Sequence, residues 1–190
     1  MEITDKFWNR LHLELDKESD RSLVIVAAAL LDEALKKCVE KRMLPAKKKE
    51  LCVFSGGNSP LSTFSSRINF CYQIGIISSA LQRDLHIIRK LRNDFAHDPF
   101  DLSFEDNSVK NRISELDSVS NYKETNPEAR SNIGPPGTRN DFIFAVSWRL
   151  YSITESLNEI SSGKEHIPEF GYFDHGELMK YFGVLIGSEQ

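Results

Sequence analysis

Three residues close together in the chain combine side-chain types that can do acid–base chemistry on a phosphate. They are Arg92, Asn93 and His97, within the run Arg-Asn-Asp-Phe-Ala-His. Histidine titrates near neutral pH and can take or return a proton. Arginine stays charged and binds phosphate through its planar fork, and asparagine can orient either group. The set suits metal-free RNA cleavage by a ribose 2′-hydroxyl, with His97 as general acid or base, Arg92 as phosphate clamp and Asn93 as orienting residue.

The helix expected over residues 80 to 96 places Arg92 in an unusual position. At about 100° per residue, Arg92 falls in the middle of an apolar stripe, which consists of Leu81, Leu85, Ile88 and Phe95. A guanidinium there must be paired, or must face a cavity or a subunit interface. It is either a core arginine neutralised by Asp32 or Glu33, or part of a joint site with His97. Since the two side chains leave a straight helix about 140° apart, the joint site needs a distorted helix end or a second copy of the seam.

A second candidate site is a local concentration of positive charge. Residues 36 to 49 hold seven Lys or Arg and one Glu, whereas the whole chain has 24 basic and 28 acidic residues and a net charge of -4. RNA, DNA or an acidic protein could dock there; the alternative is a solvated helix end, where the helix dipole favours cations. The net charge argues against coating of nucleic acid or membrane by bulk charge. The candidate residues are Lys36, Lys37, Lys41, Arg42, Lys47, Lys48 and Lys49.

Helical periodicity runs through nearly the whole chain of 190 residues, which predicts an all-α, single-domain bundle of about six to seven helices. The apolar run from Leu23 to Leu31 indicates a central buried helix, from Asp20 to about Met43. Ser59 and Ser79 are the expected caps of the next two helices. We divide the chain into an N-terminal helix (1–19), the main helical domain (20–162) and a tail with a short helix packed on that domain (163–190).

Cysteine usage and hydropathy exclude several classes of protein. The three cysteines form no Cys-x-x-Cys pair, which disfavours a disulfide framework or a zinc ribbon. The longest apolar run is far shorter than the roughly 20 residues that a membrane span needs. The remaining histidines lack metal-site spacing. We therefore expect a cytoplasmic protein without a metal or a cofactor.

Several blocks of the sequence resemble the mannitol operon repressor (MltR-like) family. They lie at residues 20–34, 60–68, 75–78, 83–86 and 88–97, and include the runs Pro-Leu-Ser-Thr-Phe and Arg-Asn-Asp-Phe-Ala-His. The resemblance implies a helical regulator of a sugar-alcohol operon. The turn at Gly75 is the only helix-turn-helix candidate, and the helix after it suits a core position better than a recognition helix. We therefore expect a repressor that acts through a partner protein or without a helix-turn-helix.

The run from Arg92 to His97 also resembles the Arg-x4-6-His motif of the HEPN superfamily. Many of these helical domains are metal-independent ribonucleases, and the motif residues of two subunits often meet at a dimer interface. This resemblance implies the alternative function, an endoribonuclease of the toxin or defence type that uses Arg92 and His97. It also implies a homodimer.

The homodimer gives a first prediction. Sedimentation at micromolar concentration should return about twice the single-chain mass of 21.7 kDa, because the heptad-like seam around Arg92 would pair with its copy. A species of single-chain mass across that concentration range would contradict the dimer.

Overall fold

The computed structural model describes residues 11, 13–44, 52–56, 59–98, 102–117, 119 and 138–163. Within these ranges the chain is helical and contains no strand, so the all-α prediction is confirmed. The helices are α2 (Asp20–Arg42), α3 (Phe64–Gln73), α4 (Ser79–His97), α5 (Asn107–Ser114) and α8 (Thr138–Glu159). The tail after residue 163, with its expected short helix, and most of the N-terminal helix lie outside the described residues.

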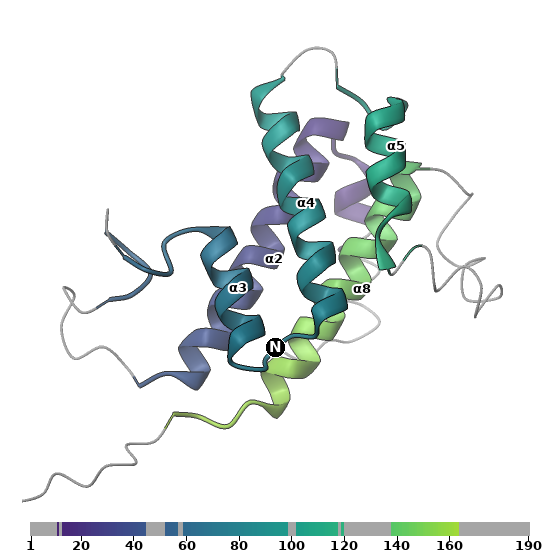
Figure 1. Ribbon diagram of the computed structural model, residues 1–190. Helices are drawn as coiled ribbons and strands as arrows, with labels where there is room; N and C mark the ends of the chain where they lie inside the picture. The colour runs from purple at the N-terminus through teal and green to yellow at the C-terminus, as the bar shows by residue number, and fades with distance from the viewer. Residues whose placement is uncertain are drawn as a thin grey trace, which may run out of the picture.

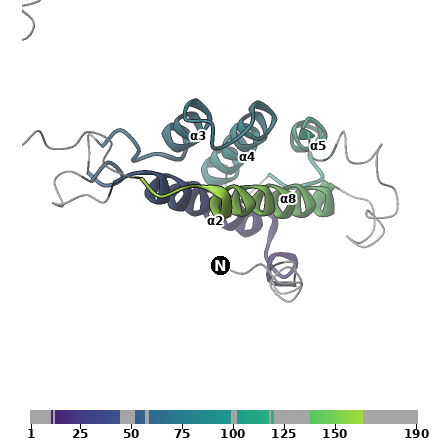
Figure 2. The same cartoon turned by 90° about the horizontal axis from the view of Figure 1, so that it is seen from below.

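The helices form two layers (Figures 1 and 2). Helices α2 and α8 lie side by side in one layer, and α3, α4 and α5 lie across them in the other. Helix α2 packs against α3, α4 and α8, which makes it the central element of the core. None of the helices in the described part of the chain is long and apolar enough to cross a membrane.

The sequence of α2 explains its central place. Leu23, Ala27, Leu31 and Leu35 are fully buried, and the small Ala27 and Ala28 let neighbouring helices approach closely. The apolar run suggested burial on all sides, but Val26 is 39% exposed. The two-layer arrangement leaves the outer edge of α2 uncovered, so the helix is central without being enclosed.

The caps of α3 and α4 differ from the predicted ones. Thr63 caps α3 in a reciprocal capping box with Ser66, and Ser78 caps α4 by accepting from the Leu81 N–H at 3.2 Å. Ser59 instead donates from its hydroxyl to the carbonyls of Cys52 and Ser55, at 3.2 and 2.6 Å. This bonding holds a turn ahead of α3, so the helix starts later than the proline at residue 60 suggested.

A buried ion pair joins the two layers. Asp84 of α4 is fully buried and accepts from Arg149 Nε of α8 at 2.7 Å. Its second oxygen accepts from the backbone N–H of Asp117 at 2.9 Å, and Arg149 Nη2 also lies 3.2 Å from the Asp117 carboxylate. The two carboxylates thus accept from a guanidinium that is 6% exposed, and the Asp117 N–H satisfies the remaining oxygen of Asp84. Such a network fixes the rotation of α4 against α8, because a buried charge that loses its partner is costly.

A second buried arginine holds α3 on α2. Arg67 Nε and Nη2 donate to the two carboxylate oxygens of Asp32, each at 2.6 Å. Its Nη1 donates to the carbonyl of Leu61 at 2.5 Å, which also fixes the turn before α3. The fork-to-fork geometry sets the register between the two helices.

We predict that replacing Asp84 by Leu lowers the free energy of unfolding by about 3–5 kcal/mol, because Arg149 is then buried without its main partner. The double variant Asp84→Leu/Arg149→Met should recover part of this loss, since it leaves no unpaired buried charge. Urea unfolding followed by circular dichroism measures both.

The matched control is Lys110→Gln, which breaks the exposed Lys110–Glu105 pair and should cost less than about 1 kcal/mol. If the single Asp84 variant were as stable as the unmodified protein, the buried pair would not be the tie between the layers.

Candidate functional site

Arg92 does not lie in the middle of the buried face of α4. The buried residues of this helix are Leu81, Asp84, Leu85, Ile88, Leu91 and Phe95. Asp84 and Leu91 move the centre of the buried face away from Arg92, which is half-buried at its edge. The predicted partner is also wrong, because Asp32 binds Arg67 and Glu33 lies near Lys36. Within the described part of the chain, the Arg92 guanidinium makes no hydrogen bond or ion pair.

The structure does not bring Arg92 and His97 together within one chain. Helix α4 remains α-helical through His97, so the two side chains leave it about 140° apart. His97 is exposed and Asn93 is half-buried. A joint site would therefore need a second copy of the chain. The apolar seam expected to pair with that copy is instead buried within the single chain, at Leu81, Leu85, Ile88 and Phe95, so that expectation is wrong. The catalytic assignment of these three residues stays a prediction.

Contacts from two other helices fix the end of α4. Asp94 forms an ion pair with Arg112 of α5, and Arg21 of α2 donates to the carbonyl of Ala96 at 3.4 Å. Asp20, at the start of α2, accepts from the Phe104 N–H at 3.0 Å and from Arg139 at 2.5 Å. Side-chain contacts thus join the end of α4, near Arg92, to both α2 and α5.

The predicted basic cluster is divided among different roles. Lys36 lies 3.7 Å from each of Glu33 and Glu40, and Lys41 Nζ donates to the carbonyl of Leu157 at 2.7 Å. Lys37 and Arg42 are exposed, whereas Lys47, Lys48 and Lys49 lie outside the described residues. The four described cations therefore do not form one free basic surface.

The outer face of α4 carries further positive charge, on residues that the helical spacing had placed off the apolar stripe. Arg83 and Lys90 are exposed there, and Arg89 is half-buried. None of the three has a carboxylate partner among the residues that the structure describes. Asp84 and Asp94 are the acidic residues of the segment from 51 to 97, and both are bound to arginines. The sequence already shows why these cations lack partners, because no acidic residue lies between Glu50 and Asp84.

Helices α3 and α4 form a side-by-side hairpin. Asn69 Oδ1 accepts from Gln82 Nε2 at 3.2 Å and lies 2.9 Å from His86 Nε2, one turn further along α4. The inner face of α4 is buried along its length, as expected for a core helix. The helix after the Gly75 turn is therefore a core helix whose outer face, with Arg83 and Lys90, remains accessible.

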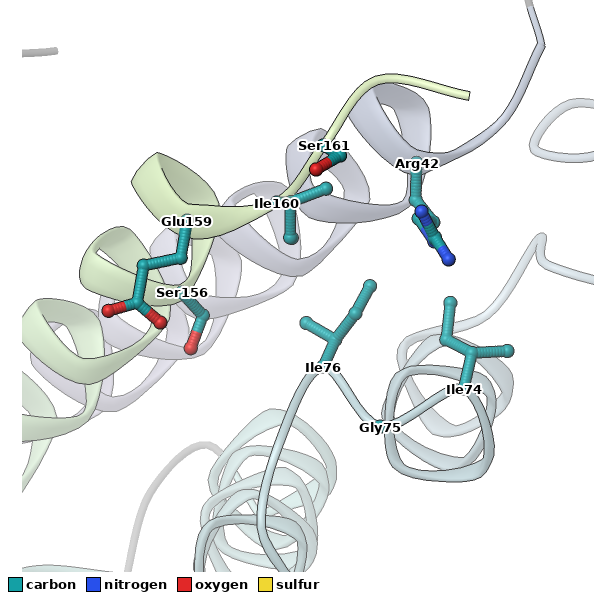
Figure 3. A pocket seen from close by; sticks show the side chains of 8 residues that line it. All are labelled: Arg42, Ile74, Gly75, Ile76, Ser156, Glu159, Ile160 and Ser161. Atoms are coloured by element: carbon teal, nitrogen blue, oxygen red, sulfur yellow. The ribbon is translucent and has the colours of Figure 1, made fainter. Parts of the chain in front are cut away.

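A cavity of about 280 Å³ lies at the opposite end of α4 from His97 (Figure 3). It opens where the last turns of α2 and α8 meet the turn between α3 and α4. Sequence reasoning missed it, because its residues come from three separate segments. No group of three or more His, Cys, Asp or Glu placed for a metal ion occurs in the part of the chain described.

Comparison with known proteins identifies the family. The family model for the mannitol repressor, MtlR, matches residues 9–136. The chain belongs to the mannitol repressor family. The family resemblance seen in the sequence is thereby confirmed, whereas the likeness of residues 92–97 to the HEPN motif stays a prediction.

Two curated relatives are the mannitol operon repressors of Escherichia coli K12 and of Escherichia coli O6:H1. Each is 29% identical over 123 residues, which is 63% of this chain and 63% of the relative. The aligned region thus spans less than two thirds of the relatives' length.

Two solved structures share the helical fold. The MtlR–HPr complex from Escherichia coli matches with a TM-score of 0.59 and 22% identity, over 79% of this chain and 99% of the solved chain. YggD from Shigella flexneri, described as a possible transcriptional regulator, matches with a TM-score of 0.54 and 15% identity, over 81% and 98%. At these identities the likeness supports the two-layer helical architecture.

His86 gives a prediction about pH. Its burial, and then the charges of Arg89 and Lys90, lower its pKa below the ordinary value of 6.5. As pH falls through about 6.5 the unfolded chain takes up this proton first, so stability is lost between that value and the lower pKa of the folded state. In His86→Gln this part of the pH dependence should disappear, as measured by urea unfolding at pH 7.5, 6.5 and 5.5.

His97→Gln is the control, because it replaces an exposed histidine of the same helix. The assignment fails if the pH dependence of His86→Gln matches that of the unmodified protein.

Proposed function

We propose that this protein is a repressor-type regulator of a carbohydrate operon, of the sugar-alcohol class, that acts through a protein partner. The observation that carries the proposal is the match of the mannitol repressor family model over residues 9–136. The two mannitol operon repressors of Escherichia coli that align with this chain support the same function.

HPr is the first partner to test. The solved relative from Escherichia coli is an MtlR–HPr complex, and this chain matches nearly all of that MtlR chain. A regulator that is controlled by a protein partner needs an accessible docking face and no DNA-reading helix of its own. Helix α4 meets the first of these needs, because its inner face is buried in the core and its outer face, with Arg83 and Lys90, is accessible.

Surface charge also favours a protein partner over direct binding to an operator. The net charge of -4 opposes long-range attraction of DNA, whose phosphates carry most of its affinity for proteins. The described part of the cluster at 36–49 offers Lys37 and Arg42 as exposed cations, and Arg83 and Lys90 add two more on α4. Such isolated cations suit the acidic groups of a protein partner. The alternative is that the cluster at 36–49 binds RNA or DNA through Lys47 to Lys49.

The proposed working form is a cytoplasmic homodimer. Trp148 and Tyr151 of α8 are 38% and 39% exposed, and their rings lie 5.9 Å apart in a row that begins with Phe144. Aromatic side chains are enriched in protein interfaces. The homodimer itself rests on the resemblance of residues 92–97 to the HEPN motif, whose copies in two subunits often meet at a dimer interface.

Deletion of the gene in the organism that encodes it tests the function. Transcripts of a sugar-alcohol uptake operon should rise several-fold in cells grown without that sugar alcohol, and plasmid-borne wild-type protein should restore the low level. RNA sequencing measures both. Unchanged transcripts of every sugar-alcohol operon would refute the regulator.

The ribonuclease alternative has its own test. Purified protein incubated with mixed RNA in EDTA should leave the RNA intact if the protein is a regulator, and His97→Ala should behave identically. Cleavage by the unmodified protein that is lost in His97→Ala, and also in Arg92→Ala, would instead support the HEPN-type enzyme.

A further inference from the structure

The cavity at the α3–α4 turn is open to solvent, and its size is close to that of a small-molecule site. Its volume of about 280 Å³ is close to the lower end of the range for ligand pockets, roughly 300–1,000 Å³. The residues that line it are Arg42, Ile74, Gly75, Ile76, Ser156, Glu159, Ile160 and Ser161. A volume of this size fits a metabolite smaller than a nucleotide.

Specific contacts hold the walls in place. Lys41 Nζ donates to the carbonyl of Leu157, which joins the last turns of α2 and α8. Beyond α8 the N–H of Gly163 donates to the carbonyl of Lys41 at 3.3 Å. A Cβ atom at residue 163 would lie 2.6 Å from the Arg42 carbonyl oxygen, so the close passage requires glycine. The third wall turns at Gly75, whose φ of +73° also favours glycine.

The two sides of the cavity offer opposite hydrogen-bonding groups. Arg42 extends from the end of α2 toward Ile74 and Ile76, and supplies only donors (Figure 3). The side formed by α8 supplies acceptors, namely the Glu159 carboxylate and the hydroxyl oxygens of Ser156 and Ser161. The Ser156 hydroxyl already donates to the Ser152 carbonyl at 3.0 Å, so its free capacity is as an acceptor.

The direction of these bonds defines the ligand. A complementary molecule carries an anionic group for Arg42 and several donors spread along the last turn of α8. Its carbon chain would lie against Ile74, Ile76 and Ile160. An amino acid concentrates its donors on one ammonium nitrogen, whereas a polyol spreads hydroxyl donors along its length. None of the described residues that line it is aromatic, which disfavours a base or a sugar ring that must stack on them.

We propose that this cavity binds a small phosphorylated polyol, with its phosphate on Arg42 and its hydroxyls on Glu159 and Ser156. The choice of a polyol over other hydroxylated anions rests on the proposed function, which the site deepens by supplying a place for an effector. Binding would join the ends of α2 and α8 to the α3–α4 turn. That turn leads directly into the helix whose outer face bears Arg83 and Lys90.

Isothermal titration of the full chain with D-mannitol 1-phosphate tests the proposal, beside titrations with D-mannitol, inorganic phosphate and L-leucine. We expect saturable binding of one mannitol 1-phosphate per chain, at least tenfold tighter than the other three. Arg42→Met and Glu159→Gln should each weaken it at least tenfold.

The matched controls are Lys37→Met on α2 and Glu155→Gln on α8, which alter exposed residues outside the lining and should leave the affinity unchanged. Thermal unfolding of all four variants checks that each is folded. As a second readout, NMR signals of the Ile74 and Ile76 methyl groups should shift on titration.

Three results would overturn the site: no binding of mannitol 1-phosphate, equally tight binding of inorganic phosphate that Glu159→Gln does not change, or tighter binding of L-leucine. The outcome is separable from that of the proposed function. If deletion raises the operon transcripts but the ligand does not bind, the site alone is wrong. If the ligand binds but deletion changes no transcript, the regulator is wrong and the site stands.

Discussion

The ion pair between Asp84 and Arg149 sets the geometry on which the rest of the molecule depends. Both residues are buried and come from different layers, and 65 positions of sequence separate them. Because neither charge can be left unpaired at that depth without a large cost, α4 can face the core in one rotation only. That rotation turns Leu91 and Phe95 inward, moves Arg92 to the edge and leaves Lys90 on the outer face.

The two ends of α4 have different chemical characters as a result. At one end lies a corner rich in arginine, with Arg92 and the exposed His97, and at the other lies the cavity between Arg42 and Glu159. Helix α4 lies between them and is buried along its inner face. A molecule bound at one end and a protein docked on the outer face would therefore both contact this helix or the turn that leads into it. This layout fits the proposed function, in which the protein acts through a protein partner.

Sequence reasoning was most successful where local signals suffice. Periodicity and helix-ending residues predicted α2 and α4 nearly to the residue. The errors involve partners distant in sequence. Asp32 was predicted to pair with Arg92, but it pairs with Arg67, which lies 35 positions away in the sequence. The cavity was not predicted because its lining residues come from three separate segments. Helical spacing tells which residues share a face, whereas the partner of a charge depends on how the helices meet.

The central claim is that this protein regulates through contact with another protein and does not read DNA itself. The most direct test compares two titrations of the purified full chain at physiological salt, one with HPr from the same organism and one with DNA carrying the control region of its sugar-alcohol operon. The account predicts saturable binding of HPr and no sequence-specific shift of the DNA by the chain alone. Sequence-specific DNA binding without any binding of HPr would contradict it.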